Sequence, residues 1–176
     1  VTGDTAYVIR HTGALIRGVK VGPSPDWLKQ SLESAGQRSI NNVVDALNCV
    51  MLAMGQPSGA FDAGKLETDN GVVRIDIREA RAGEKIKVLT GEEYELAPGM
   101  YVFTDAVGGG LLDIAGIKGG LASGVTEATT DLFVSAGTYT PELIRRASQS
   151  LKLFTDASMR YQNRPSPELT AYGMKH

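Results

Sequence analysis

Few side chains in this 176-residue sequence are of the types that carry out covalent or metal chemistry. The sequence contains two histidines, His11 and His176, and a single cysteine, Cys49. A catalytic triad or a zinc site needs several such groups held together, but His11 lies between predicted strands and His176 is the last residue. No histidine or lysine lies next to Cys49 in the sequence to activate its thiol, so we expect a small core side chain. These residues favour neither a histidine-based triad nor a metal site.

A set of polar side chains with helical spacing is the next candidate. Asn41, Asp45 and Asn48 fall at i, i+4 and i+7, and no charged side chain occurs between Asp45 and Asp62. This spacing places the three residues on one face of an α-helix. We expect a mostly buried helix whose polar face is a narrow edge that looks into a pocket. The alternative is a set of groups that cap and bridge loops around an ordinary core helix.

A glycine-rich stretch could bring the backbone close to a ligand. Seven glycines lie between Gly108 and Gly124, and glycine permits positive φ angles and close approach of the backbone. Their spacing matches neither the phosphate-binding loop nor the dinucleotide fingerprint. Tight turns alone would explain these glycines equally well.

The charge pattern limits the choice of partners only weakly. A formal net charge of −2 and a hydrophobic content of 42% describe an ordinary soluble globule, without the general basic excess that indicates nucleic acid binding. The C-terminal third is locally basic, which favours either phosphate contact or a solvated helix face. Between residues 142 and 164 five basic residues outweigh two acidic ones: Arg145, Arg146, Lys152, Arg160 and Arg164 against Glu142 and Asp156.

Length and cysteine count set the organisation of the chain. A length of 176 residues predicts a single domain over 1–176 with a sizeable core. The single cysteine excludes an internal disulfide and fits a reducing compartment. Gly55 and Pro57 end the neutral stretch well before the roughly 20 apolar residues that a membrane span needs. Because the sequence starts without methionine, we expect a segment of a longer protein.

Periodicity predicts an α+β fold with a β-rich core, either a barrel-like or a mixed sheet, and flanking helices. Alternating apolar residues indicate strands, and helical spacing together with Asn, Pro and Gly signals indicates where helices begin and end. The expected strands are a β-rich segment over 6–21, a half-buried strand over 72–80, a hairpin turning at Thr90-Gly91, a strand after Pro98-Gly99, one short strand in the glycine stretch and a buried strand over 131–136. Four helices are expected. The first follows a Ser24 cap, the second begins at Asn41 or Asn42, the third begins at Thr140-Pro141, and the fourth begins at a Thr155 or Asp156 cap. An irregular C-terminal end follows the fourth helix.

Three long motifs carry a resemblance to a known family. The stretches "IRGVKVGPSPDWLKQSLESAGQRSINNVVDALNCVMLAMGQPSGAFD", "AGIKGGLASGVTEATTDLFVSA" and "LKLFTDASMRY" are similar to the B3/B4 module of the bacterial phenylalanine–tRNA ligase β subunit. The similarity covers residues 7–167 in the order of the family. It implies a β-rich α+β editing unit that hydrolyses tRNA(Phe) wrongly charged with tyrosine, while aminoacylation belongs to the α subunit.

The resemblance also implies partners and a location. The chain would be part of a longer cytoplasmic β subunit that works with the ligase α subunit, the rest of the β subunit and the acceptor end of tRNA(Phe). The module itself would need no cofactor and no metal, and would not contact a membrane.

The resemblance places the neutral helix and the turn after it at the editing pocket. Four positions have the same residues as the family's pocket: Asn48, Gly119, Thr155 and Ala157. Thr155 and Ala157 are small and would shape the amino-acid site. On this basis we expect these residues to converge on one cleft together with Gly59 and Ser135.

Four departures from the family concern the chemistry of that pocket. Gly59 stands where the family has a histidine, and Ser135 stands where it has the glutamate that recognises the tyrosine hydroxyl. Leu47 replaces a threonine, and the later Arg-aromatic-Glu-Arg-Gly motif reads "RYQNR". No catalytic residue is therefore assigned, and we expect an editing module whose hydrolysis is lost or weakened. The alternatives are an active deacylase with a modified pocket and a free-standing protein that binds RNA or aminoacyl-tRNA.

Overall fold

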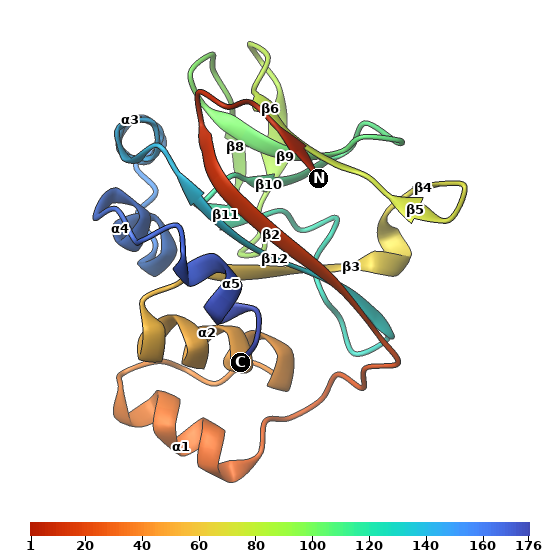
Figure 1. Cartoon of the computed structure of the whole chain (residues 1–176), viewed down its shortest axis with the longest axis vertical. Helices are drawn as coiled ribbons and strands as arrows, with labels where there is room; N and C mark the ends of the chain where they lie inside the picture. Colours follow the sequence, from red (N-terminus) through yellow and green to blue (C-terminus); the bar gives the residue numbers. More distant parts are fainter.

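The computed structural model describes all 176 residues, Val1–His176, and is built around a three-stranded and a five-stranded β-sheet (Figure 1). In the three-stranded sheet, β12 (Asp131–Tyr139) lies between β2 (Val8–Arg17) and β3 (Ser58–Asp62) and is antiparallel to both. β12 is buried along almost its whole length. The strand predicted over 131–136 is therefore the centre of this sheet, and it extends three residues further than the sequence indicated.

The five-stranded sheet is mixed. Its strands, in spatial order, are β1 (Thr2–Gly3), β6 (Ile75–Glu79), β9 (Tyr101–Asp105), β10 (Leu111–Ile114) and β11 (Lys118–Gly119). β1 runs parallel to β6, whereas the other neighbours are antiparallel. The strands form separate sheets and do not close into a barrel, so the mixed-sheet alternative is confirmed and the barrel-like one is wrong.

Two small hairpins and a 3₁₀ turn complete the β structure. β7 (Lys85–Lys87) pairs with β8 (Glu93–Glu95) across the predicted turn, and β4 (Thr68–Asp69) pairs with β5 (Val72–Val73). The 3₁₀ turn η1 covers Ala63–Lys65. The glycine stretch contributes two short strands, β10 and β11, where the sequence predicted one.

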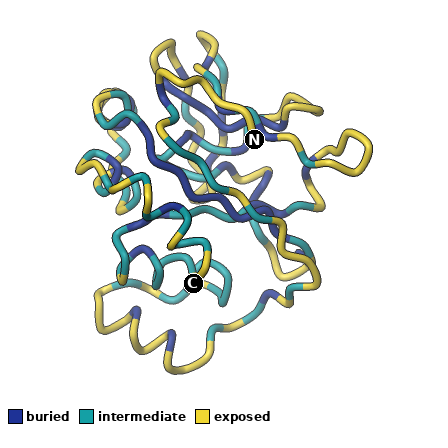
Figure 2. The backbone as a smooth tube through the Cα atoms, viewed as in Figure 1, coloured by how far each residue is buried: buried dark blue, intermediate teal, exposed yellow.

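The two sheets share one hydrophobic core of 22 buried residues. The alternation predicted for β6 is confirmed, because Ile75 and Ile77 are buried while the residues between and after them reach the surface. Tyr7 stacks on Tyr101 with ring centroids 4.1 Å apart and on Tyr139 at 5.0 Å. Figure 2 shows buried residues along β9 and β12 and exposed residues in the loops and on most of α1 (Asp26–Ser34).

Five helices flank the sheets (Figure 1). Besides α1 they are α2 (Asn42–Met54), α3 (Pro141–Leu151), α4 (Asp156–Gln162) and α5 (Leu169–Gly173). α1 packs on α2, α3 packs on α4, and α5 contacts β2, β12 and α2. None of these helices is long and apolar enough to cross a membrane.

The C-terminal end is helical, which corrects the expectation of an irregular end. α5 has only five residues, and a helix this short carries too few residues to show a periodic pattern and depends on tertiary contacts for its stability. Thr170 provides such a contact, since it is fully buried and its hydroxyl bonds to that of Thr12 at 3.2 Å.

The predicted limits of α2 are confirmed. The Asn41 side chain accepts hydrogen bonds from the backbone N–H groups of Val43 and Val44, at 3.1 and 2.9 Å, and Gly55 ends the helix with φ +76°. The expectation of a mostly buried helix is wrong, because only Asp45 and Met51 are fully buried. The remaining apolar side chains of α2 stay partly exposed beside a cavity and α5.

Asp45 belongs to the interior and not to a polar edge. It is completely buried, and its carboxylate accepts hydrogen bonds from the Ser24 hydroxyl (2.5 Å), the Ser39 hydroxyl (2.6 Å) and the Ile40 N–H (2.8 Å). Ser24 therefore does not cap α1, whose N-cap is Pro25 without a side-chain bond. Burial alone would raise the pKa of Asp45, but these hydrogen bonds outweigh it and hold the pKa below its usual value. The carboxylate joins the segment before α1 to the start of α2.

We expect Asp45→Ala to lower the free energy of unfolding by about 3 kcal/mol, because hydrogen bonds to a charged group each contribute about 1.5–3 kcal/mol. Urea unfolding at pH 7 measures this loss, and Asp26→Ala, at an exposed first-turn aspartate of α1, is the matched control with an effect below about 1 kcal/mol. The Asp45 contribution is present above the unfolded pKa of about 3.9 and is lost as the pH falls through the lower folded pKa. A difference that does not shrink as the pH falls below about 3.9 would contradict the assignment.

Candidate functional site

A cavity of about 550 Å³ lies where α2, β3, β12, α4 and the glycine-rich segment meet. This volume is in the usual range for small-molecule sites. The structure brings six of the seven pocket residues expected from the sequence to its wall, from five elements distant in sequence. They are Leu47, Asn48, Gly59, Gly119, Ser135 and Ala157.

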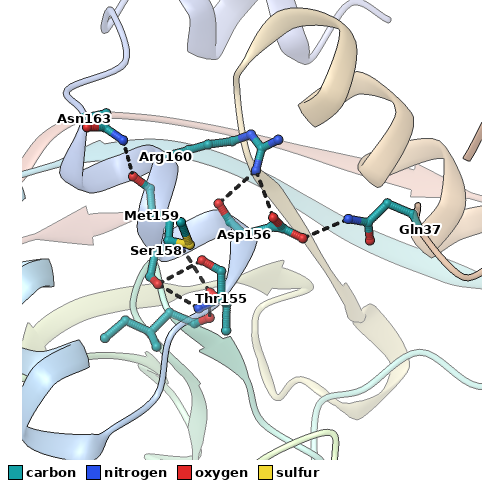
Figure 3. Close-up of polar contacts among 8 residues, drawn as sticks. Gln37, Thr155, Asp156, Ser158, Met159, Arg160 and Asn163 are labelled. Atoms are coloured by element: carbon teal, nitrogen blue, oxygen red, sulfur yellow. Dashed lines mark hydrogen bonds and ion pairs between the residues drawn. The ribbon is translucent and has the colours of Figure 1, made fainter. Parts of the chain in front are cut away.

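Thr155 is the exception, and it lies behind the wall. Its hydroxyl donates to the Ile117 carbonyl at 2.8 Å and accepts from the Ser158 N–H at 3.1 Å, while Ser158 Oγ accepts from the Thr155 N–H at 2.9 Å. These bonds form a capping box at the start of α4 (Figure 3). The predicted cap is confirmed. The Thr155 hydroxyl holds Ile117, which lines the cavity, while Thr155 itself is not among the lining residues.

Further contacts fix α4 against the neighbouring loop. The Gln37 side chain donates to Asp156 Oδ2 at 2.9 Å, and Arg160 bonds to the carbonyl oxygen of Asp156 at 3.1 Å (Figure 3). Gln37 follows α1, so this bond connects the α1–α2 loop to the helix that carries Ala157. The end of the cavity that Ala157 lines is therefore held by contacts that lie outside the cavity.

The glycines of the cavity wall differ in how much space surrounds them. A Cβ added at Gly119 would lie 2.9 Å from Leu89 Cδ1, and one added at Gly120 would lie 2.7 Å from the Leu112 carbonyl oxygen. The backbone at Gly120 is thus packed too closely for a side chain, whereas the neighbour at Gly119 is the end of the exposed Leu89 side chain. A Cβ at Gly59 would meet no atom within 4 Å, so the missing histidine leaves free space in the cavity.

Ser135 is hydrogen-bonded to His11, which the sequence alone assigned to neither a triad nor a metal site. His11 Nε2 and Ser135 Oγ are 3.0 Å apart, and the His11 ring packs edge-on against Phe103 at 5.6 Å. Burial lowers the pKa of His11 to about 4, so the imidazole is neutral at pH 7. Strand register would have revealed the pair, since His11 lies opposite Gly137, two residues from Ser135, and diagonal positions on one sheet face are neighbours.

A carboxyl group also lines the cavity. Asp113 lies on β10, and its Oδ1 is buried without a hydrogen-bond partner. Burial raises its pKa well above the usual value. The sequence did contain a signal for Asp113, because "LLDIAG" has one charged residue in an otherwise apolar run.

Aromatic side chains form much of the remaining wall. Phe61, Phe103, Tyr139 and Tyr161 all line the cavity. Tyr161 packs edge-on against Tyr139 at 4.9 Å, and its hydroxyl donates to the Pro57 carbonyl at 2.9 Å. These contacts hold the rings in place, so the cavity offers a preformed apolar surface with a few polar groups.

The basic residues of the C-terminal third form a separate depression of about 510 Å³ between α3 and the end of α4. Arg145, Arg146 and Arg164 line it together with Glu142, which bonds to Arg164 at 2.5 Å. Arg160 contacts Asp156 instead. The structure thus gathers three of the five predicted basic residues, and phosphate contact there stays a prediction.

Comparison with known proteins identifies the family. The sequence model of the B3/4 domain matches residues 8–176. The chain is 45% identical over 154 residues to a phenylalanine–tRNA ligase β subunit of Synechococcus sp. (strain JA-3-3Ab), covering 86% of this chain and 18% of the relative. The β subunit of Moorella thermoacetica is 46% identical over 153 residues, covering 87% and 18%.

Further matches agree in sequence and in fold. The β subunit of Dehalococcoides mccartyi (strain ATCC BAA-2266 / KCTC 15142 / 195) is 39% identical over 172 residues, which is 98% of this chain and 20% of that protein. An N-terminal fragment of the Pyrococcus horikoshii β subunit matches in fold with a TM-score of 0.55 and 15% identity, covering 93% of this chain and 48% of that one. The chain spans about a fifth of the curated relatives it matches. Since the family model covers almost the entire sequence, the chain belongs to the B3/4 domain family.

Proposed function

We propose that this chain is the B3/4 domain of a phenylalanine–tRNA ligase β subunit, and that its cavity receives the aminoacyl end of charged tRNA(Phe) while hydrolysing tyrosyl esters weakly or not at all. The ligase α subunit and the rest of the β subunit would be its partners in the cytoplasm. The similarity to β subunits over 86–98% of the chain supports this role.

The observation that carries the proposal is the pairing of Gly59 with Ser135. The two residues are register partners on β3 and β12, and both line the cavity. Side chains at such positions lie on the same face of a sheet, so the histidine and the glutamate that the family places there would lie side by side. In this chain Gly59 has only a hydrogen atom as its side chain, and the Ser135 hydroxyl bonds to the neutral His11 ring. No carboxylate and no imidazole reach the cavity from these two positions.

The remaining polar groups of the wall suit binding better than hydrolysis. Neutral hydrogen bonds are about half as strong as charge-assisted ones, so Ser135 is a weaker partner for a substrate hydroxyl than a carboxylate. Thr155 is already engaged with Ile117 and Ser158 and is not available to orient water. An active deacylase with a modified pocket would therefore have to rely on other polar groups of the wall, such as Asn48, Ser135 and Asp113, and on backbone N–H groups.

Deacylation kinetics test the proposal. We expect the full ligase that carries this segment to release tyrosine from Tyr-tRNA(Phe) at close to the rate without protein, and no faster than it releases phenylalanine from Phe-tRNA(Phe). General acid–base catalysis contributes roughly 10²–10⁴-fold, so its loss is measurable. Rapid, tyrosine-selective clearance, at the rate of a relative that has both the histidine and the glutamate, would overturn the proposal.

A further inference from the structure

α3 turns a polar face towards the depression beside the end of α4, the helix on which it packs (Figure 1). Four residues of α3 line this hollow at i, i+3, i+4 and i+7, a spacing that places them on one side of a helix: Glu142, Arg145, Arg146 and Gln149. Gln162 and Arg164 line it from the end of α4, and no hydrophobic side chain takes part. We call this hollow the arginine depression.

Two arginines of the depression have no acidic partner. Arg145 and Arg146 are exposed neighbours on α3, and the ion pairs of the protein all involve other residues. Guanidinium groups stay charged in proteins, and like charges held in one hollow repel each other. An anion bound between them would remove this repulsion.

Arg164 enters the depression through an unfavourable backbone conformation. Its φ of +55° lies in the left-handed region, which is costly for a residue that has a side chain. The guanidinium bonds to Glu142 at 2.5 Å and so connects α3 to the segment after α4. Conformations of this kind persist where the surrounding structure holds them, often at functional sites.

The charges of the depression do not cancel. A hydrogen bond from its own backbone N–H and the bond from Arg164 hold the pKa of Glu142 below its usual value, so this carboxylate is ionised at pH 7. Three guanidinium groups face this one carboxylate. Two positive charges are left without a counter-charge, and this excess selects an anionic ligand.

The groups present suit a phosphate better than a carboxylate on a peptide. The planar guanidinium presents paired N–H groups that match two oxygens of a phosphate. The amides of Gln149 and Gln162 belong to the same lining, and arginine and glutamine side chains are among the usual partners of nucleic-acid phosphates. An acidic peptide would also bring apolar side chains, for which the lining has no hydrophobic partner.

The arginine depression adjoins the cavity through α4. Tyr161 lines the cavity, and the next residue, Gln162, lines the depression. Ala157, which also lines the cavity, lies about 8 Å from Gln162 along the helix axis. Since a nucleic-acid strand carries one phosphate about every 3.4 Å of helix axis, a few nucleotides span this distance.

We propose that the arginine depression binds backbone phosphates of the RNA whose aminoacyl end enters the cavity. Arg145 and Arg146 contact the phosphate oxygens, while the pair of Arg164 and Glu142 holds the opposite side of the site in place. This inference rests on the proposed function and adds to it a second contact surface outside the cavity wall.

Replacing Arg145 and Arg146 together should weaken RNA binding and its dependence on salt. The probe is tRNA(Phe) with a fluorescent label at its 5′ end, titrated with the 176-residue chain in anisotropy measurements between about 50 and 200 mM salt. We expect Arg145→Ala with Arg146→Ala to raise the Kd about tenfold at about 0.1 M salt, and to reduce the slope of log K against log salt by about 1.4–1.8. An unchanged Kd and slope would overturn the inference and leave the proposed function standing.

Two further variants distinguish a phosphate site from a general effect of charge. Arg17→Ala with Arg81→Ala removes two exposed arginines that line neither hollow, and should change the Kd less than about twofold because distant charges are screened. Glu142→Gln should lower the Kd about threefold, since it removes the negative charge while the amide oxygen still accepts from Arg164. Equal weakening by the control pair, or weaker binding by Glu142→Gln, would contradict a phosphate in the depression. A cooperative urea transition in each variant excludes unfolding as the cause.

Two competing ligands separate the remaining outcomes. An oligoglutamate peptide that displaced tRNA(Phe) as well as unlabelled RNA does would reassign the site to carboxylates and overturn the phosphate class. The L-tyrosyl amide of 3′-amino-3′-deoxyadenosine is an uncleavable form of the charged end without a phosphate, and should bind equally to the unchanged chain and the arginine variant. If this amide fails to bind while the arginine effect on tRNA(Phe) remains, the cavity role is overturned and the phosphate site is supported. Absence of all tRNA(Phe) binding would overturn both.

Discussion

A chain that carries both Gly59→His and Ser135→Glu should hydrolyse Tyr-tRNA(Phe) at least about 10²-fold faster than the unchanged chain, the lower end of the usual effect of a placed acid–base group. The space for the histidine is present, because a Cβ at Gly59 meets no atom within 4 Å. Since Gly59 and Ser135 are register partners, the imidazole and the carboxylate would face the cavity together. Deacylation of Tyr-tRNA(Phe) and Phe-tRNA(Phe) by the full ligase measures the effect.

The single substitutions and a displaced histidine serve as controls. Each single substitution should raise the rate of Tyr-tRNA(Phe) hydrolysis less than the double substitution does, because the imidazole or the carboxylate then lacks the other. Gly110→His places the same residue at another glycine with open surroundings, outside the cavity wall, and should leave the rate unchanged. If the double variant folds but remains as slow as the unchanged chain, the departures at these two positions are not the reason for weak hydrolysis.

The second large effect concerns the backbone at the cavity wall. We expect Gly116→Ala to lower the free energy of unfolding by about 4 kcal/mol. Gly116 has φ +71°, and its added Cβ would lie 2.6 Å from Ile144 Cδ1 and 3.1 and 3.2 Å from the rings of Tyr139 and Tyr161. A left-handed conformation costs a side-chain-bearing residue about 1–2 kcal/mol, and overpacking a core costs typically about 1–3 kcal/mol. Urea unfolding at pH 7 tests the sum.

Gly83→Ala separates the two contributions. Gly83 has φ +78° and no atom within 4 Å of the added Cβ, so its substitution should cost only the conformational part, about 1–2 kcal/mol. Equal losses for the two variants would mean that the contacts with Ile144, Tyr139 and Tyr161 relax without cost. The close approach at Gly116 would then not be what shapes this part of the wall.

Local signals were sufficient to predict much of the secondary structure. The Asn41 cap and the Gly55 stop of α2, the alternation of β6 and the Thr155 cap of α4 all depend on residues close in sequence. The same is true of the hairpin over residues 85–95. Hydrogen bonds at helix ends and the alternation of strands require no knowledge of distant segments. The family resemblance likewise followed from contiguous motifs, and six of the seven residues that it singled out line one cavity.

Tertiary structure alone decided which groups are free to act. The sequence presents Asp45 and Asp113 as two aspartates in apolar surroundings, yet one receives three hydrogen bonds and the other has an oxygen with none. His11 meets Ser135 only through the register of β2 with β12, and Thr155 turns towards Ile117 instead of the cavity. Burial, pairing and protonation of a polar group depend on partners up to 158 residues away. A local pattern predicts which helix, strand or turn carries a side chain, whereas packing between distant segments determines what that side chain contacts.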